Sequence, residues 1–463
     1  MKGKDLKRLG VPNGEPMRLM HGLIKHLTGA GKDKDEIART VKAILADPEA
    51  YRSNETFGAF AAAVSPSRVF VHRDQPAVYR QWGTDLDEQS IQQMERACQL
   101  PVSLSGALMP DAHVGYGLPI GGVLATDNAV IPYAVGVDIA CRMKLTALDI
   151  PVRELNTAQG KERLTRAIAA ETRFGVGSIH KSRRDHSVLD ADWSVSRITQ
   201  HNKDRAWSQL GTSGSGNHFV EFGEITLPVP FQGLEPGTYL GLLSHSGSRG
   251  TGASVADYYS KLAISFHREL PKELLYLAWL DLDTEEGQEY WAAMELMGQY
   301  AAANHACIHR HIAKHLGASV LMDIENHHNY AWKENHGGRE VIVHRKGATP
   351  AGEGVIGIIP GSMASPAFIV RGKGNPASLN SASHGAGRVM SRKKAIETFR
   401  WKDVNDLLTA KGVTLLSAGL DEIPFVYKKI EEVMAAQTDL VETVARFDPR
   451  IVKMAPSGER PED

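Results

Sequence analysis

The segment AVGVDIACRM, residues 134–143, is the stretch around which this chain is organised. It places Asp138 and Cys141 three residues apart, so a hard oxygen ligand and a soft sulfur ligand can reach one metal ion or bridge two. Four further segments set a histidine beside glycine or asparagine, a pattern that predicts a turn with an exposed ring: SGSGNHFVEF around His218, LLSHSGSRG around His245, ENHHNYAW around His328 and SASHGAGRVMSR around His384.

Composition narrows the class of protein. The chain has 463 residues, 42% of them hydrophobic and 23% charged, which is typical of a soluble globular protein. A formal net charge of −1 excludes general electrostatic attraction to nucleic acid or anionic membrane, so RNA binding requires a local basic cleft. Three cysteines are too few for a disulfide framework, and no apolar signal or spanning run is visible. We expect a cytoplasmic protein with reduced thiols and no membrane role.

The periodicity of apolar residues predicts two parts. Residues 1–65 form a helical accessory region, because 17–27 and 35–45 have apolar residues at three-to-four spacing. Residues 66–463 form a mixed α/β (α+β) catalytic domain, in which short apolar runs alternate with glycine turns. Within it we expect helices at 87–100, 153–172, 250–270, 285–316 and over most of 392–446, and strands at 239–246, 319–324, 340–344 and 354–360.

The candidate ligands combine a carboxylate, a thiolate and imidazoles, a mixture that suits Mn²⁺, Zn²⁺, Fe²⁺ or Co²⁺ better than Mg²⁺ or Ca²⁺. The set is Asp138, Cys141, His218, His245 and His328. Spacing alone leaves open that the cysteine is a buried apolar residue and that the histidines are ordinary turn residues. A second group, which lacks the carboxylate of an HExxH motif, is interpreted as structural or solvent-facing: His305, His309, His311 and His315.

His384 differs from the other histidines, because small residues surround it and Arg388, Arg392, Lys393 and Lys394 follow. An imidazole nitrogen in such a loop can attack a phosphorus while neighbouring cations take up the developing charge. The alternative is a glycine-loop histidine that only bonds backbone groups. The run HRKGATPA, residues 344–351, adds an arginine and a lysine beside a glycine turn, an arrangement that suits phosphate oxygens.

Taken together, eight motifs closely resemble the RtcB family of RNA-splicing ligases. They occur in the family's order between Val69 and Lys453, and the first 65 or so residues lie outside the resemblance. The motifs are PDAHVGYGLPIGGV (110–123), VGVDIAC (135–141), GNHFVEF (216–222), HSGSRG (245–250), HN (328–329), HRKGAT (344–349), PGSM (360–363) and SHGAGRVMSR (383–392).

The resemblance implies a single large catalytic domain with a central cleft for metal and nucleotide. Its expected reaction joins an RNA 3′-phosphate or 2′,3′-cyclic phosphate to a 5′-hydroxyl, with GTP and two Mn²⁺ per chain as cofactors. The position of the nucleophile matches His384, which would carry GMP as a phosphoramidate and pass it to the RNA 3′-phosphate, from which the 5′-hydroxyl displaces it. A cyclic end would first be opened. We expect a monomer, and an activating protein partner is left open.

The resemblance also implies a ligand set. One Mn²⁺ would be held by Cys141, His245 and His328, and the other by Asp138, Cys141 and His218. Glu221 would accept hydrogen bonds from guanine N1–H and N2–H₂ and so select GTP over ATP. The full set of positions that match the family's GMP-binding residues is Asn217, His218, Phe219, Val220, Glu221, His328, Asn329, Gly361, Ser362, Met363, His384, Gly385, Ala386, Gly387 and Lys453.

Some residues depart from the family pattern. Ala140 and Arg142 flank Cys141 where glycine is more common, Ala364 follows PGSM where glycine is common, and His305 follows Asn304 where arginine is usual. These departures bear on rate and on the RNA substrate, which need not be tRNA. Two other functions are considered: a binuclear metallophosphoesterase that hydrolyses RNA ends, and a catalytically silent protein that binds them. His384 discriminates, because a hydrolase needs no phosphoramidate.

Overall fold

The computed structural model describes residues 3–12, 15–52, 54–64 and 73–459. It divides into two compact units, Met1–Phe70 and Val71–Asp463, and each is described by itself. The smaller unit consists of short helices around an apolar core, with Leu6, Met20, Val41, Ile44 and Phe60 fully buried. Its elements are α1 (Gly3–Arg8), α2 (Glu15–Gly29), α3 (Lys34–Ala46), η1 (Glu49–Tyr51) and α4 (Gly58–Val64). The helices expected at 17–27 and 35–45 are therefore confirmed.

An eight-stranded sheet forms one half of the larger unit. Its order is β13-β14-β17-β6-β7-β5-β9, and β16 pairs with β17. The sheet curls so that its two edge strands, β9 and β13, approach one another. The Asn326 side chain of β9 accepts a hydrogen bond from the Ile358 backbone of β13 at 2.9 Å. The strands are β5 (Arg142–Leu148), β6 (Phe219–Leu227), β7 (Gly237–Ser246), β9 (Val320–His327), β13 (Ile356–Ile359), β14 (Ala367–Gly372), β16 (Thr414–Ser417) and β17 (Val441–Met454).

A five-stranded sheet of order β1-β2-β3-β11-β10 forms the other half. His328 alone separates β9 of the first sheet from β10 of the second, so this residue lies at the junction of the two. The strands are β1 (Val78–Gln81), β2 (Ser103–His113), β3 (Ile120–Thr126), β10 (Asn329–His336) and β11 (Arg339–Lys346). Two small ladders pair β4 (Ala129–Val130) with β8 (Leu280–Asp281), and β12 (Ala348–Pro350) with β15 (Ser381–Ser383).

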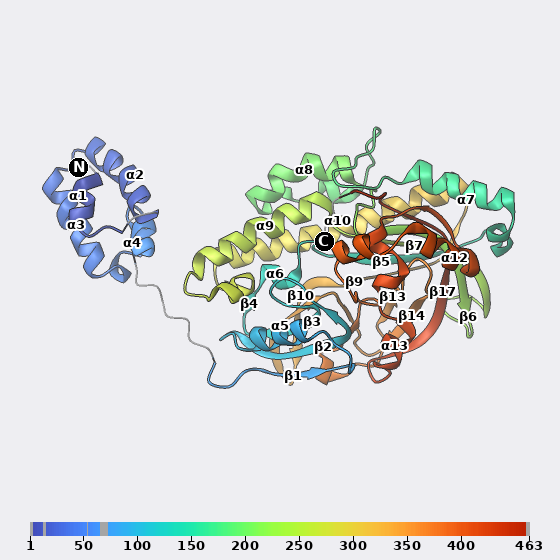
Figure 1. The fold of residues 1–463 in the computed structure, drawn as a ribbon. Helices are drawn as coiled ribbons and strands as arrows, with labels where there is room; N and C mark the ends of the chain where they lie inside the picture. Colours follow the sequence, from blue (N-terminus) through green and yellow to red (C-terminus); the bar gives the residue numbers. More distant parts are fainter. Residues whose placement is uncertain (1–2, 13–14, 53, 65–72, 460–463) are drawn as a thin grey trace. The chain divides into compact units, whose positions relative to one another are not determined.

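The longer helices α7 to α10 gather along one side of the larger unit (Figure 1). The 32-residue helix α10 begins after its N-cap Thr284 and ends at Gly317, whose φ of 61° closes the helix in the left-handed region. Its Ile308 and Ile312 pack in one apolar cluster with Leu164 of α7. The helices are α5 (Glu88–Cys98), α6 (Pro132–Val135), α7 (Ala158–Glu171), α8 (Arg197–Gln209), α9 (Arg249–Phe266), α10 (Glu285–Leu316), α11 (Arg392–Thr398), α12 (Trp401–Lys411) and α13 (Ile430–Ala435).

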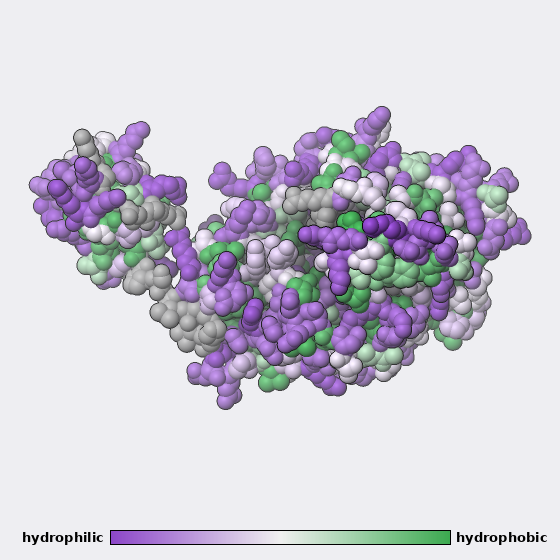
Figure 2. All heavy atoms as spheres, viewed as in Figure 1, coloured by the Kyte–Doolittle hydropathy of each residue, from purple (hydrophilic) through white to green (hydrophobic). Residues whose placement is uncertain are grey.

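Short 3₁₀ turns connect these elements. They are η2 (Val152–Asn156), η3 (Ser187–Asp190), η4 (Trp193–Val195), η5 (Lys272–Leu277), η6 (Pro376–Ser378), η7 (Leu420–Glu422) and η8 (Pro424–Val426). Figure 2 shows that hydrophilic residues cover most of the visible face of the larger unit, with hydrophobic residues scattered among them. Among the described residues, no helix combines the length and the apolar character that a membrane span requires.

The mixed α/β (α+β) class is confirmed, and so is the full extent of the helix expected at 285–316. The prediction that 392–446 is mainly helical is wrong at its C-terminal end, because β17 begins at Val441. This strand pairs with β6 on one side and β14 on the other. Its partners come from segments more than 60 residues away, so local periodicity did not reveal it.

Candidate active site

Residues from both sheets line one cavity of about 840 Å³. Strand alternation directs their side chains into it. On β7, His245 faces the cavity, while Ser244 and Ser246 face helix α10, where His305 bonds the Ser244 hydroxyl at 2.6 Å and the Ser246 carbonyl at 3.0 Å. His309 adds a further bond to Ser244 at 2.8 Å. The helical histidines behind β7 are thus structural, as the sequence predicted.

Five side chains that the sequence scatters over some 190 residues meet in this cavity. Cys141 Sγ lies 3.1 Å from His245 Nε2 and 3.5 Å from His218 Nε2. His218 Nε2 lies 3.0 Å from Asp138 Oδ2, and His245 Nε2 lies 3.2 Å from His328 Nε2. They form two buried groups whose ligand atoms lie within 4.8 Å of one another, Cys141–His245–His328 and Asp138–Cys141–His218. Cys141 belongs to both.

The protonation of these residues suits a metal site. The Nδ1 of His245 donates to the Asn217 carbonyl at 3.1 Å, which leaves the Nε2 lone pair facing the cluster. Burial lowers the pKa of His245 to about 3 and that of His328 well below its ordinary value, so both rings are neutral at pH 7. Burial acts to raise the pKa of Asp138, but nearby His218 and Arg249 hold it below its ordinary value. The Asp138 carboxylate is therefore ionised.

The same site contains a buried acceptor that protein groups do not satisfy. Asp138 Oδ1 accepts from the Ser248 backbone at 3.0 Å, whereas the buried Asp138 Oδ2 lies 3.0 Å from His218 Nε2 without the geometry of a hydrogen bond. A bound cation would satisfy this oxygen. Gly247 explains the close approach of the HSGSRG turn, because a Cβ there would overlap the Asp138 carboxylate. The donor set fits a transition metal, and the thiol of Cys141 belongs to both potential ligand groups.

His384 follows strand β15 and lines the same cavity, with its ring centroid 5.0 Å from that of His328. Its Nδ1 lies 2.7 Å from Asp111 Oδ2, which also accepts from the backbone N–H groups of His384 at 3.1 Å and Gly385 at 3.2 Å. Burial acts to raise the pKa of Asp111, but the bond with His384 and its charge hold it below the ordinary value. An ionised Asp111 requires a proton on Nδ1 and leaves the lone pair on Nε2.

Sequence reasoning gave Asp111 no role, although it lies inside the PDAHVGYG motif. A carboxylate within a glycine-rich motif was the available signal. The glycines of the His384 loop allow the contact, because Gly387 has a φ of 74° and a Cβ there would overlap the Asp111 carbonyl. The structure therefore joins β2 and the loop after β15 through one buried carboxylate.

Most residues expected to bind the nucleotide line the cavity: Asn217, His218, Phe219, Glu221, His328, Asn329, Gly361, Ser362, Met363, His384, Gly385, Ala386 and Gly387. Val220 and Lys453 do not line it. They pair with one another across β6 and β17 on the opposite face, where the Lys453 ammonium lies 5.3 Å from the centroid of the Phe174 ring. Burial raises the pKa of Glu221 well above its ordinary value.

The basic residues of HRKGAT divide between core and cavity. Arg345 is buried away from the cavity and bonds Glu334 at 2.6 Å and the Ser381 hydroxyl at 2.7 Å, so the expectation that it meets phosphate is wrong. Lys346 lines the cavity, and burial lowers its pKa to about 7.

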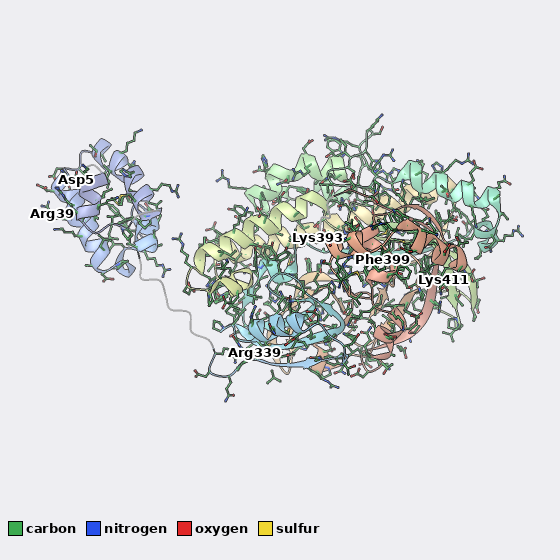
Figure 3. The ribbon with its side chains drawn as sticks, in the orientation of Figure 1. Asp5, Arg39, Arg339, Lys393, Phe399 and Lys411 are labelled. Carbon is green, nitrogen blue, oxygen red and sulfur yellow. The ribbon has the colours of Figure 1, made fainter. Side chains whose placement is uncertain are left out.

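The basic residues after His384 divide in the same way. Arg388 and Arg392 line the cavity, where Arg388 bonds the Asp421 carbonyl at 2.8 Å and Arg392 bonds the Asp421 carboxylate at 2.9 Å. Lys393, labelled in Figure 3, and Lys394 are exposed on α11 and do not line the cavity.

The departures from the family pattern have clear environments. Ala140 has a φ of 58°, the left-handed region that glycine favours, and its N–H donates to the Asn329 carbonyl at 2.7 Å. The Arg142 guanidinium does not line the cavity, and its charge is paired with Glu325 at 3.0 Å. Ala364 is buried in an apolar cluster with Val404 and Leu408. None of these residues displaces a ligand.

Comparison with known proteins gives a consistent result. A family model described as tRNA-splicing ligase RtcB matches residues 93–454. The chain is 34% identical over 395 residues to the RNA-splicing ligase RtcB of Escherichia coli strain K12, covering 78% of this chain and 93% of that protein. It is 31% identical over 453 residues to the tRNA-splicing ligase RtcB of Methanococcus maripaludis, covering 81% and 92%. It is 31% identical over 413 residues to the RNA-splicing ligase RtcB of Mycobacterium tuberculosis, covering 74% and 94%.

Proposed function

The chain belongs to the RtcB family of tRNA-splicing ligases, and from that premise we propose that it joins RNA ends. Its substrates are an RNA 3′-phosphate or 2′,3′-cyclic phosphate end and a 5′-hydroxyl end, and its cofactors are GTP and two Mn²⁺. The observation that carries the proposal is the position of His384, whose Nδ1 is bonded to Asp111 and whose ring lies 5.0 Å from that of the ligand His328.

The metal ligands follow the two buried groups. Cys141, His245 and His328 would hold one ion, and Asp138, Cys141 and His218 would hold the other. Two bound divalent cations would neutralise the phosphate charge that gathers at the centre of the reaction. The thiolate and imidazoles fit Mn²⁺ as well as Zn²⁺, Fe²⁺ and Co²⁺. Direct comparison of these ions in the ligation assay identifies the one the enzyme uses.

The first step is an attack by His384 on GTP. The lone pair of Nε2 forms a bond to the α-phosphorus, the bond from that phosphorus to the bridging oxygen breaks, and pyrophosphate leaves with its electron pair. Positive charge then develops on the imidazole, and the ionised Asp111 bonded to Nδ1 stabilises it. Asp111 also holds the ring in one orientation through its bonds to the backbone of the loop.

Two further steps complete the join. An oxygen of the RNA 3′-phosphate attacks the phosphorus of the bound GMP, and the P–N bond breaks to return the lone pair to Nε2. The 5′-hydroxyl oxygen then bonds to the phosphorus of the RNA 3′-phosphate, loses its proton, and displaces GMP. A 2′,3′-cyclic end enters this sequence after hydrolysis to the 3′-monophosphate.

Glu221 is proposed as the residue that recognises guanine. It is buried, lines the cavity from β6, and in its ionised form would offer two oxygens to the N1–H and N2–H₂ donors of the base. Adenine has an acceptor at N1, so the same carboxylate disfavours ATP. Asn217, Phe219, Asn329, the turn of residues 361–363 and the loop of residues 384–387 complete the proposed nucleotide site.

A metallophosphoesterase is the second candidate, since the two ligand groups alone would support hydrolysis. The Asp111–His384 pair favours the ligase, because a hydrolase does not need a buried carboxylate to orient a histidine nucleophile. We also propose that residues 1–65 are an accessory region to a catalytic domain of residues 66–463, and that the enzyme acts as a cytoplasmic monomer.

The test is the covalent intermediate. Purified protein incubated with GTP labelled at the α-phosphorus and with Mn²⁺ should form a protein–GMP adduct that is labile in acid and stable in base. His384→Ala should form none. His201→Ala is the matched control, because His201 is exposed on α8 and does not line the cavity. Release of RNA phosphate without any adduct would favour the phosphoesterase and contradict the ligase.

A further inference from the structure

Three tyrosines form a cluster at the edge of the cavity, and none of the roles described above uses them. Tyr116 comes from the loop between β2 and β3, Tyr133 from α6 and Tyr276 from η5. The ring centroids of Tyr133 and Tyr276 are 4.6 Å apart, and those of Tyr116 and Tyr276 are 5.6 Å apart with planes at 63°. Tyr116 and Tyr133 line the cavity. Tyr116 is 65% exposed and Tyr276 is 41% exposed, so the cluster presents aromatic surface to solvent.

The cluster is held in place by its surroundings. Gly117 has a φ of 70°, and a Cβ at this position would lie 2.7 Å from the Tyr276 carbonyl oxygen, so the loop packs directly on η5. The Lys346 ammonium donates to the Tyr116 carbonyl and lies 5.5 Å from the centroid of the Tyr133 ring. An exposed ring on a fixed loop loses little conformational freedom when it binds a ligand.

The same contacts link the cluster to the nucleophile. Lys346 is followed by Gly347, where a Cβ would lie 3.1 Å from His384 Cε1. Tyr116 also lies five positions after Asp111, the hydrogen-bond partner of His384, in the same stretch of chain. Glu221, proposed to bind guanine, instead lies on β6 of the other sheet. The tyrosines are therefore linked to the reacting histidine through Lys346 and Gly347, from the sheet that does not carry Glu221.

Exposed aromatic rings at the edge of a cleft are side chains that bind single-stranded RNA, because bases stack on the rings. We propose that Tyr116 and Tyr276, supported by Tyr133, form a stacking platform for the RNA nucleobase next to the join. The proposal rests on the proposed RNA-ligase function and adds a substrate-binding subsite to it. Since every base has a stacking face, the platform accepts RNA ends of any sequence.

The first experiment measures the joining of two short single-stranded RNAs by the full chain. Tyr116→Ala should lower kcat/KM by about 5- to 150-fold, the factor that corresponds to about 1–3 kcal/mol of base stacking. Tyr116→Phe keeps the ring and should restore most of the activity. Tyr258→Ala is the matched control, because Tyr258 is 44% exposed on α9 and does not line the cavity. An unchanged kcat/KM in Tyr116→Ala overturns the proposal.

A second experiment removes the base instead of the ring. RNAs with an abasic last nucleotide on the 3′-phosphate strand, or an abasic first nucleotide on the 5′-hydroxyl strand, are joined by the wild type and by Tyr116→Ala. One abasic strand should lower wild-type kcat/KM by the same factor as the substitution, and the two losses should not multiply. The RNA strand whose abasic form gives this non-multiplying loss is the strand whose terminal base stacks on the platform. Losses that multiply for both strands contradict the platform.

The protein–GMP adduct is measured on the same preparations, so that two failures can be told apart. If the wild type forms no adduct and joins no RNA, the proposed function itself fails. If the wild type joins RNA and Tyr116→Ala joins it equally well, only the platform fails. Should Tyr116→Ala not fold, Tyr276→Ala carries the same measurements, since Tyr276 supplies the second exposed ring.

Discussion

The carboxylate of Asp111 accepts a hydrogen bond from His384 Nδ1 across 2.7 Å, although the two residues are 273 positions apart in the chain. The side chain of Asp111 is fully buried and that of His384 is 14% exposed. The pair therefore has a closed side, where the proton is held, and an open side toward the cavity, where Nε2 carries the lone pair.

Asp111→Asn should lower the rate of protein–GMP formation by about 10²–10⁴, because the neutral amide neither fixes the Nδ1–H tautomer nor stabilises the charged ring. The amide is close to the carboxylate in size, so the fold should remain. The rate is measured with labelled GTP in single-turnover conditions, and Mn²⁺ content is measured by elemental analysis on the same samples. A variant with wild-type rate would contradict the role of Asp111.

The shared sulfur leads to a prediction about metal content. At Mn²⁺ concentrations that saturate the wild type with two ions, Asp138→Ala should retain one ion, since it removes a ligand from one group only. Cys141→Ala should lose both, because Cys141 belongs to both groups. Elemental analysis after gel filtration gives the stoichiometry. Equal losses in the two variants would argue against a bridging thiolate.

Glu221 gives a pH-dependent prediction. Burial raises its pKa well above the ordinary value, so the group is neutral at low pH and ionises as pH rises. The ionised carboxylate is the better acceptor for the guanine N–H donors. GTP affinity should therefore increase as the pH rises through the raised pKa of Glu221, while the N1–H of guanine is still in place. In Glu221→Gln this increase should vanish, and preference over ATP should fall. Calorimetric titration with each nucleotide checks both effects, and an unchanged pH profile in the variant would exclude Glu221.

Ala140 stands in a conformation that costs an alanine about 1 kcal/mol relative to glycine. Ala140→Gly should therefore raise the free energy of unfolding by about 1 kcal/mol. Urea denaturation of the full chain provides the measurement. Ala147→Gly, in strand β5, is the matched control and should be destabilising, because that backbone is extended. A loss of stability in Ala140→Gly would show that the packing of the Ala140 methyl group stabilises the fold by more than the left-handed backbone costs.

Lys346 links stability to pH. Its folded pKa is about 7, below the ordinary value of 10.5, because the ammonium is buried. Between these values the unfolded chain binds more protons than the folded one, so the wild type gains stability as pH rises. From pH 7 to pH 9 the gain attributable to this residue should be about 2 kcal/mol.

Lys346→Met should lack this gain, while Lys394→Met, an exposed lysine on α11, should keep it. Urea denaturation of the three proteins at the two pH values makes the comparison. Parallel pH profiles for the wild type and Lys346→Met would mean that Lys346 stays charged in the folded protein.

The sequence by itself determined the residue types of the centre and much of the fold class. Asp138 and Cys141 lie close together in one segment, and each histidine carries its own glycine or asparagine neighbours, so local pattern was enough to make them candidates. The extent of α10 was equally local, because its periodicity and its terminal glycine are properties of consecutive residues.

Tertiary structure decided the contacts that no local pattern records. Strand β17 exists because β6 and β14 pair with it, Arg345 is directed into the core by Glu334, and Asp111 reaches His384 only after β2 packs beside the loop of β15. Tyr116, Tyr133 and Tyr276 are likewise brought together from three separate segments. Local periodicity records neighbours within a few positions, whereas strand pairing, buried ion pairs and cavity walls depend on contacts between segments far apart in the chain.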